Sequence, residues 1–354
     1  MDNIDKEMIF LYLFFVGATL ALINSHFLKD SITIILQYAF AIFVQYSVLR
    51  VFFKYNYHSD YKLKVETLLK MYTVSFFIAC LVGIAIYLGL FPHSDMYYSG
   101  NGRLNSIRGN ANSLAKYIVI SLPLILAYFD YKKNNVLLCV VLFTAVVNLI
   151  LTASFGGLLY TGLVIIYYYL LKIIYTPSKS TGKQLLVFLC FALICVSYIY
   201  VNPPEVVAER ILSINDVSQA GSYNLKVALM KESLEMNSIS SLLVGIGPGS
   251  YPYVSIYGTN VHNLYLLIMS EFGFLSLLGF LLFLFSVYIK SLKNLKIVDK
   301  NFKIVIIGLN SSLLAFCMTL TTNTHTYTRS LWFFVVALWV INKSINEKSL
   351  GKRM

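Results

Sequence analysis

The sequence predicts an all-α, polytopic membrane protein of about ten transmembrane helices with one large extracytoplasmic loop. Its 354 residues are 58% hydrophobic and only 12% charged, whereas soluble domains are about 45 to 50% apolar and about 25% charged. The apolar residues fall into repeated runs of about 20, the length of helix that crosses a hydrocarbon core of roughly 30 Å. These runs are continuous rather than alternating, which favours helices over a membrane barrel.

The expected helices follow the apolar runs in order. We place them at residues 8–27, 31–49, 68–91, 111–129, 135–152, 156–172, 184–202, 263–288, 304–322 and 330–342. Together they form a single membrane domain over residues 1–354, and residues 203–262 form the large loop between the seventh and eighth helices. The sequence shows no internal repeat, so it does not support the inverted-repeat architecture of many transporters for this chain.

The basic residues predict the orientation of these helices, because cytoplasmic connections carry an excess of Lys and Arg. With both termini in the cytoplasm, most of the 28 basic residues fall on the cytoplasmic side, above all in residues 50–70 and 290–303. Adding or removing one helix in the middle would break this alternation. Membrane topology therefore explains the net charge of +12, and we do not expect nucleic acid as a partner.

Several other classes of feature are not expected. The first apolar run follows three acidic residues and one lysine, with no small-residue cleavage site, so it predicts a retained helix rather than a signal peptide. The cysteines all lie inside apolar runs, which predicts neither a disulfide framework nor a metal cluster. Motifs for a phosphate loop or a bound cofactor are absent from the sequence. The five cysteines are Cys80, Cys139, Cys190, Cys195 and Cys317.

The loop at residues 203–262 is far longer than an ordinary connection, and such loops are usually functional or disordered. Residues 224–243 within it place apolar residues such as Leu225 and Leu229 against charged residues such as Lys226 and Glu232. This amphipathic pattern predicts a helix that lies at the membrane interface.

The first candidate constellation is GRLNSIRGNANSLAKY, at residues 102–117. If a helix begins near its fourth residue, then Arg108, Asn112 and Lys116 lie at i, i+4 and i+8 and share one face. A lysine about one turn into the membrane is costly unless it faces a polar cavity or an anion, although it can also reach the headgroups as an interfacial residue. Arg103 and Arg108 are either solvated loop charges or guanidinium forks suited to phosphate.

The second constellation closes the large loop, at residues 245–275. Gly245 and Gly247 belong to a glycine-rich stretch that predicts a tight turn. His262 and Asn263 follow at the start of the eighth helix. A neutral histidine at a membrane boundary can accept a proton from a hydroxyl group, or it can serve as a cap or interface residue.

Glu271 lies nine residues beyond His262 and therefore deeper in the membrane along a helix. An intramembrane carboxylate is a functional hypothesis, and the alternative is a hydrogen-bonding or ion-pair residue that stabilises helix packing. Nine residues turn a helix by about half a circle, so His262 and Glu271 are not expected to form a dyad.

Four segments stand out in the sequence: RGNANSLAKY, LTASFGGLLYTGL, LLVGIGPGSY and VHNLYLLIMSEFGFLSLLGF. They resemble the O-antigen polymerases and O-antigen ligases of bacterial surface polysaccharide assembly. They occur in the order expected for the family, in the central and C-terminal parts of the chain. The resemblance implies a metal-independent, membrane-embedded glycosyltransferase of the bacterial plasma membrane that acts on glycans linked to undecaprenyl diphosphate.

The resemblance also implies roles for individual residues. His262 matches the family's loop histidine beside the acceptor, and Asn263 would orient it. Outward-facing cations would hold the diphosphate: Arg103, Arg108, Lys116, Arg210 and Arg329. From the two constellations themselves we assign supporting roles to Asn112, Glu271, Gly245 and Gly247.

The chain departs from the family pattern at two positions. Ser154, Phe155 and Gly156 stand where the family often has Ser-Arg-Gly. Ser222 and Tyr223 stand where an arginine often precedes an aromatic residue. The cations named above would therefore have to supply the charge, and the departures weaken the ligase interpretation most.

The expected function is polymerisation of lipid-linked oligosaccharide repeat units for O-antigen, capsule or exopolysaccharide. The expected partners are undecaprenyl-diphosphate-linked oligosaccharides, membrane lipids, and the flippase and chain-length regulator of the same pathway. One alternative is ligase-type transfer of a finished glycan to another acceptor. The other is a polysaccharide flippase or transporter, whose path would use Gln37, Gln45 and Asn148 inside helices.

Overall fold

The structure, a computed structural model, describes residues 5–54, 61–92, 94–99, 102–178, 181–182, 184–186, 197, 201, 221–236, 239–322 and 329–351. These residues are mostly helical, and the one β-type feature among them is an isolated bridge between Tyr98 and Leu104. The chain divides into two compact units. Unit 1 comprises Met1–Tyr55, Val217–Asn294 and Cys317–Met354, and unit 2 comprises Asn56–Asp216 and Leu295–Phe316.

Among the described residues, seven helices are long and apolar enough to cross a membrane. They are Lys6–Asn24, Leu28–Phe53, Leu63–Tyr87, Ala111–Lys132, Phe155–Tyr175, Leu264–Asn294 and Lys300–Thr322. With the shorter apolar helix α6 (Asn135–Leu151) and α15 (Arg329–Gly351), they account for nine of the ten helices expected from the sequence. The seventh, at residues 184–202, lies largely outside the described residues. The all-α, polytopic membrane class is confirmed.

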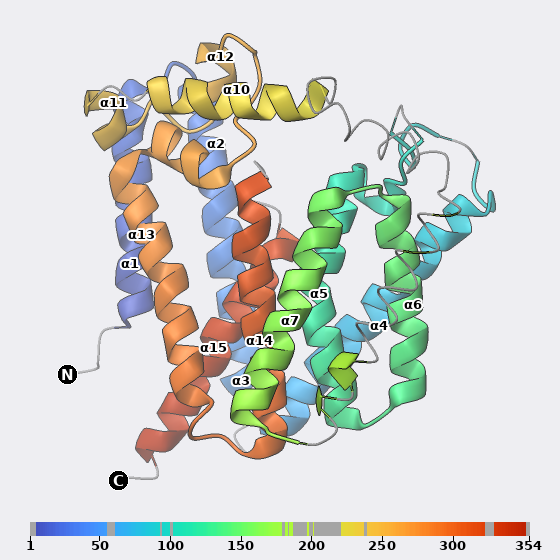
Figure 1. Cartoon of the computed structure of the whole chain (residues 1–354). Helices are drawn as coiled ribbons and strands as arrows, with labels where there is room; N and C mark the ends of the chain where they lie inside the picture. The colour runs from blue at the N-terminus through green and yellow to red at the C-terminus, as the bar shows by residue number, and fades with distance from the viewer. Residues whose placement is uncertain are drawn as a thin grey trace. The chain divides into compact units, whose positions relative to one another are not determined.

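The core of unit 1 is the pairing of α1 (Lys6–Leu20) with α13 (Leu264–Asn294), which run side by side (Figure 1). Small residues let the two backbones approach. A Cβ on Gly279 would come 2.5 Å from the backbone nitrogen of Phe14, and the hydroxyl of Ser276 donates a hydrogen bond to the Phe14 carbonyl at 3.0 Å. Close packing of small residues of this kind drives helix association inside membranes.

The helix expected at residues 31–49 is longer than expected and is not regular. It consists of α2 (Leu28–Ala39), a π-helical turn (Phe40–Val44) and α3 (Gln45–Lys54). The start of α1 and the end of α15 lie at the same end of unit 1 (Figure 1). Three ion pairs join α15 to the residue before α1, α3 to α15, and α13 to α1. They link Lys343 to Asp5 at 2.7 Å, Arg50 to Glu347 at 3.0 Å and Lys290 to Glu7 at 3.2 Å.

The opposite end of unit 1 is covered by three short helices from the large loop (Figure 1). They are α10 (Gly221–Glu235), α11 (Ile239–Val244) and α12 (Tyr251–Val254). Figure 1 shows α10 lying across the ends of the long helices. The expected amphipathic helix is therefore present, although it is divided in two near residue 236.

Unit 2 is built around α5 (Ala111–Lys132), which packs against α4 (Tyr61–Tyr87), α6 and α7 (Phe155–Tyr175). Gly308 of α14 (Lys300–Thr319) also packs closely on α5, because its Cβ would come 2.4 Å from that of Ala127. The result is that α5 is the most buried of the candidate membrane spans.

Candidate functional site

Arg103 holds the loop before α5 in place within unit 2. It is buried, with 7% of its surface exposed. Its Nε donates a hydrogen bond to the Thr152 carbonyl at 2.8 Å, and its Nη2 donates one to Oδ1 of Asn112 at 2.9 Å. The backbone N–H of Leu104 adds a bond to the Leu151 carbonyl at 3.0 Å. Arg103 thus joins the loop to the end of α6 and to the first turn of α5.

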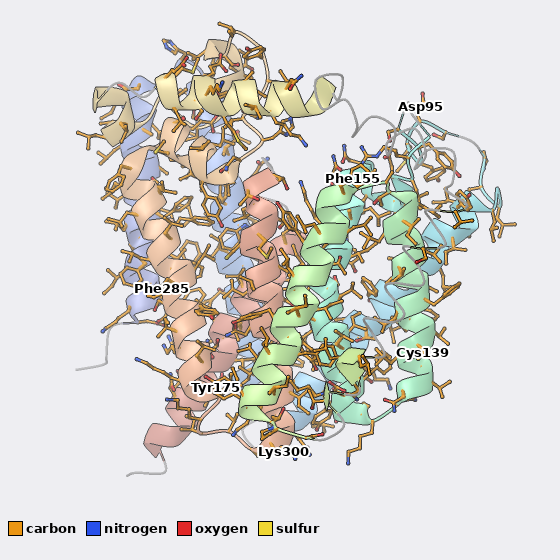
Figure 2. All side chains as sticks on the ribbon, in the orientation of Figure 1. Asp95, Cys139, Phe155, Tyr175, Phe285 and Lys300 are labelled. Atoms are coloured by element: carbon orange, nitrogen blue, oxygen red, sulfur yellow. The ribbon has the colours of Figure 1, made fainter. Side chains whose placement is uncertain are left out.

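Asn112 is the point where three segments of unit 2 meet. Its Oδ1 accepts from Arg103 and, at 3.4 Å, from the hydroxyl of Ser154. Ser154 caps α7 by accepting the N–H of Gly157 at 3.3 Å. Figure 2 shows Asp95, in the loop before α5, and Phe155, at the start of α7, at the same end of unit 2. Phe155 holds the position where the family often has an arginine.

Arg108 does not share a helix face with Asn112 and Lys116, so that expectation is wrong. It ends a short 3₁₀ turn, Ser106–Arg108, and Gly109 follows in the left-handed conformation with φ of 66°. The helix α5 begins only after Asn110, whose side chain caps it by accepting two backbone N–H groups. A left-handed glycine and a capping asparagine together interrupt the helix that the spacing suggested.

Arg108 instead lies over an aromatic ring. Its guanidinium carbon is 3.8 Å from the centroid of the Tyr117 ring, a cation–π geometry. Arg108 is half-buried, and so is Lys116, which lies about 7.5 Å along α5 from Ala111. Two cations therefore lie near the start of α5, one on the ring of Tyr117 and one on the helix itself.

The glycine-rich turn in unit 1 forms as expected. Gly245, Gly247 and Gly249 have φ of 85°, 99° and 77°, a region that L side chains rarely adopt. The N–H of Gly247 donates to the carbonyl of Glu271 at 3.0 Å, and Asn24 donates to the Gly245 carbonyl at 2.9 Å. The turn is therefore bonded to α13 and to the connection between α1 and α2.

Glu271 is buried in α13, with 3% of its surface exposed. Its Oε1 accepts the backbone N–H of Tyr251, the first residue of α12, at 3.0 Å. Two residues later α13 bends at Gly273, which has φ of 81° and ψ of 171°. These contacts favour the alternative stated for Glu271, a hydrogen-bonding residue that stabilises packing.

His262 and Asn263 stand directly before α13, as predicted. The Oδ1 of Asn263 accepts the N–H of Leu266 at 3.2 Å, and its carbonyl accepts the N–H of Leu267 at 2.9 Å, so Asn263 caps the helix. His262 is half-buried. The Asn263 side chain consequently stabilises the backbone turn that presents His262.

The structural role of Glu232, in the same region, could not be predicted from the sequence. The amphipathic pattern places it on the polar face of α10, but in the structure it is buried, with 8% of its surface exposed. Its carboxylate accepts from the Tyr251 hydroxyl at 3.2 Å, the Ser255 hydroxyl at 2.7 Å and the Ile256 N–H at 2.7 Å. Burial, followed by the charge of Glu232, raises the pKa of Tyr251, so its hydroxyl stays a donor.

The expected site residues that the structure describes are divided between the two units. Arg103, Arg108, Asn112 and Lys116 belong to unit 2, and Gly245, Gly247, His262, Asn263 and Glu271 belong to unit 1. Arg210 lies outside the described residues, and Arg329 is described only in its backbone, as the first residue of α15. The roles assigned to all these residues stay predictions.

Part of the chain matches a known protein family. The family model described as O-antigen ligase matches residues 140–284, which run from α6 to the second half of α13. This range contains three of the four segments on which the resemblance rests, and only the segment around Arg108 lies outside it. No curated protein matches the chain. Over residues 140–284, the match confirms the resemblance of this chain to the O-antigen polymerase and ligase family.

Proposed function

We propose that this chain is a glycosyltransferase that polymerises lipid-linked oligosaccharide repeat units at the outer face of a bacterial plasma membrane. The observation that carries the proposal is the match of residues 140–284 to the O-antigen ligase family, because it includes both the glycine turn and His262. The apolar helices support a membrane setting, which suits substrates with long lipid tails. The donor is a growing glycan on undecaprenyl diphosphate.

The reaction needs an activated hydroxyl and a stabilised leaving group. A hydroxyl oxygen of the incoming repeat unit bonds to the anomeric carbon of the donor's reducing-end sugar, and the bond from that carbon to the diphosphate breaks. The hydroxyl proton passes to a base, and the diphosphate leaves with the bonding electron pair. Fixed cations near the leaving oxygens stabilise the charge that develops in the transition state.

Within this proposal His262 is the base or hydrogen-bond partner of the acceptor hydroxyl. Asn263 supports it by capping α13, which fixes the backbone on which His262 stands. A neutral imidazole suits this role because it takes up a proton near neutral pH.

The cations assigned to the diphosphate differ in their surroundings. Arg103 is buried and donates two hydrogen bonds to Thr152 and Asn112, so its contribution is to hold the loop in place. Arg108 and Lys116 are half-buried near the start of α5 and are the cations that we propose to contact the diphosphate. Arg210 and Arg329 remain candidates from the sequence alone.

The first experiment tests the function and the role of His262 together. In a strain that lacks the gene, surface glycan should collapse to single repeat units, and the wild-type gene should restore long chains. His262→Ala, expressed at the wild-type level, should fail to restore them. His26→Ala is the matched control, because His26 is an exposed histidine before α2 to which we assign no role. Long chains with His262→Ala would remove the catalytic assignment.

The second experiment tests the diphosphate contact. Arg108→Ala should weaken binding of the lipid-linked donor more than Arg108→Lys, because lysine keeps the charge but loses the bidentate fork. The measurement is the KM for the donor in proteoliposomes. Equal KM values for the wild type, Arg108→Ala and Arg108→Lys would remove Arg108 from the proposal.

Ligase-type transfer is the second candidate, since the matching family is described as O-antigen ligase. A ligase would pass a finished glycan to a different acceptor. Deleting it would leave long chains on the carrier lipid, whereas deleting a polymerase would leave single repeat units. Analysis of the lipid-linked pool in the deletion strain therefore separates the two.

A further inference from the structure

The large loop returns to α13 through residues 250–262, and the first part of this segment is bonded to the carboxylate of Glu232. Glu232 of α10 accepts from three donors in this segment: the Tyr251 hydroxyl at 3.2 Å, the Ser255 hydroxyl at 2.7 Å and the Ile256 N–H at 2.7 Å. We call these four residues the Glu232 clasp. All belong to unit 1.

The clasp is itself bonded to the helix that carries Asn263 as its cap. Tyr251 is fully buried, and its backbone N–H donates to the Glu271 carboxylate of α13 at 3.0 Å. Its hydroxyl, within reach of Glu232, also lies 3.1 Å from the Leu229 carbonyl of α10. Tyr251 therefore ties α10 to α13 through two different carboxylates.

From the clasp the chain runs a short way to His262. Ser255 organises the first turn, because its hydroxyl accepts the N–H of Tyr257 and its carbonyl accepts the N–H of Gly258, both at 3.1 Å. Val261, fully buried, then precedes His262. The position of the histidine is thus bounded by the clasp on one side and by the capped start of α13 on the other.

We infer that Glu232 is a positioning residue, which holds residues 255–258 on α10 and thereby sets where His262 is presented. The catalytic importance of Glu232 rests on the proposed function. Its effect on the position of residues 255–258 does not depend on that function. The carboxylate is suited to this task because both its oxygens only accept, and all three partners are donors. In a glutamine one acceptor oxygen becomes an NH2 donor, which either faces the Ile256 N–H or forces the two hydroxyl groups to accept instead of donate.

The inference is tested by substituting Glu232→Gln in the full-length protein and measuring local mobility. A spin label is placed at Ile256→Cys, where the side chain is 83% exposed and the backbone N–H is kept. A reference label is placed at Leu234→Cys, 58% exposed on α10. The five natural cysteines are replaced beforehand.

With Glu232→Gln, the label at position 256 should become more mobile, while the label at position 234 should not change. The matched control is Glu235→Gln, the same substitution at an exposed position of the same helix, which should leave both labels unchanged. An unchanged spectrum at 256, or an equal rise at 256 and 234, would overturn the inference. If Glu232→Gln does not fold, Ser255→Ala removes one donor and should give the same selective rise.

The rate of glycan transfer then tests the catalytic consequence. A displaced reacting group commonly costs on the order of 10²-fold in rate, so Glu232→Gln should lower kcat by roughly that factor with little change in KM. If kcat is unchanged while His262→Ala is inactive, the positioning role is wrong and the proposed function stands. If His262→Ala is active while the label at 256 is mobilised, the function assigned to His262 fails and Glu232 still fixes the segment.

Discussion

Gly245 and Gly273 lie against each other where the turn after α11 meets the bend of α13. A Cβ on Gly245 would come 2.4 Å from the carbonyl oxygen of Glu271, and a Cβ on Gly273 would come 2.5 Å from the carbonyl oxygen of Leu243. Both residues have positive φ, of 85° and 81°. Two glycines far apart in sequence thus allow two backbones to touch beside the Glu232 clasp.

Replacing Gly273 should therefore destabilise unit 1. Gly273→Ala places a Cβ against backbone atoms that cannot move aside, in a conformation that is nearly exclusive to glycine and that costs other residues about 1–3 kcal/mol. We expect a clearly lower melting temperature of the purified protein in detergent.

Substitutions at two other glycines separate the two causes of the lower melting temperature, namely the steric contact of the Cβ and the positive φ. A Cβ on Gly89 would meet no atom of the described residues within 4 Å, but Gly89 has φ of 76°, so Gly89→Ala should show the conformational cost alone. A Cβ on Gly162, within α7, also meets none of these atoms within 4 Å, so Gly162→Ala should be neutral or slightly stabilising. Equal melting temperatures for Gly273→Ala and Gly162→Ala would contradict the close approach.

Arg103 and Arg108 should respond differently to substitution. Arg103→Ala leaves the Thr152 carbonyl and the Asn112 amide without a charged donor, and hydrogen bonds to charged groups contribute about 1.5–3 kcal/mol each. Arg108→Ala loses a cation–π contact of about 0.5–1 kcal/mol. Thermal melting should therefore fall more for Arg103→Ala, whereas donor KM should rise more for Arg108→Ala. If the melting temperature fell more for Arg108→Ala, or the donor KM rose more for Arg103→Ala, the structural role and the diphosphate-binding role would have to be exchanged between the two arginines.

Asn148 and Gly83 should behave as a coupled pair. The Asn148 side chain donates to the Cys80 carbonyl of α4 at 2.8 Å, and a Cβ on Gly83 would come 1.9 Å from its Oδ1. Gly83→Ala should displace this side chain, and such bonds between membrane helices contribute about 0.6 kcal/mol, with a maximum near 1.7. In an Asn148→Ala background, the same Gly83→Ala change should cost clearly less. Additive effects in this double-mutant cycle, read from unfolding in detergent, would rule out the coupling.

Asp130 and Lys172 form a nearly buried ion pair between α5 and α7, at 2.5 Å, with 10% and 8% of their side chains exposed. Tyr168 donates to the same carboxylate oxygen at 2.6 Å. Lys172→Met removes one charge and leaves the other buried, which typically costs about 3–5 kcal/mol. The double variant Asp130→Asn, Lys172→Met should recover much of that loss. A single variant as stable as the wild type would mean that the pair is effectively solvated.

Nine of the ten expected helices, in their order, could be predicted from the sequence because a bilayer admits few solutions. Backbone groups in hydrocarbon must bond within their own segment, so an apolar run of about 20 residues has to become a spanning helix. The glycine turn at Gly245 and Gly247 was predictable for a related reason, since glycine alone adopts those φ values at little cost. His262 and Asn263 could be placed at the start of α13 because the apolar run begins there.

The details of the candidate site were not predictable in the same way. Residues 105–117 have the spacing of one continuous helix, yet Gly109 and Asn110 end one turn and start another, which moves Arg108 onto the ring of Tyr117. The π-helical turn at Phe40–Val44 and the bend at Gly273 also left no distinct pattern in the sequence. These features depend on which neighbour each side chain meets.

The sequence by itself determined that the chain lies in a membrane, where nine of its helices fall, and which family it resembles. Those properties follow from local hydrophobicity and from short motifs, which need no knowledge of distant contacts. Only the tertiary structure decided that Arg103 holds a loop and that Glu232, on the polar side of its helix, is a buried acceptor for three donors. The reason is physical: whether a charged group faces water, lipid or a protein donor depends on segments remote in sequence that fold against it.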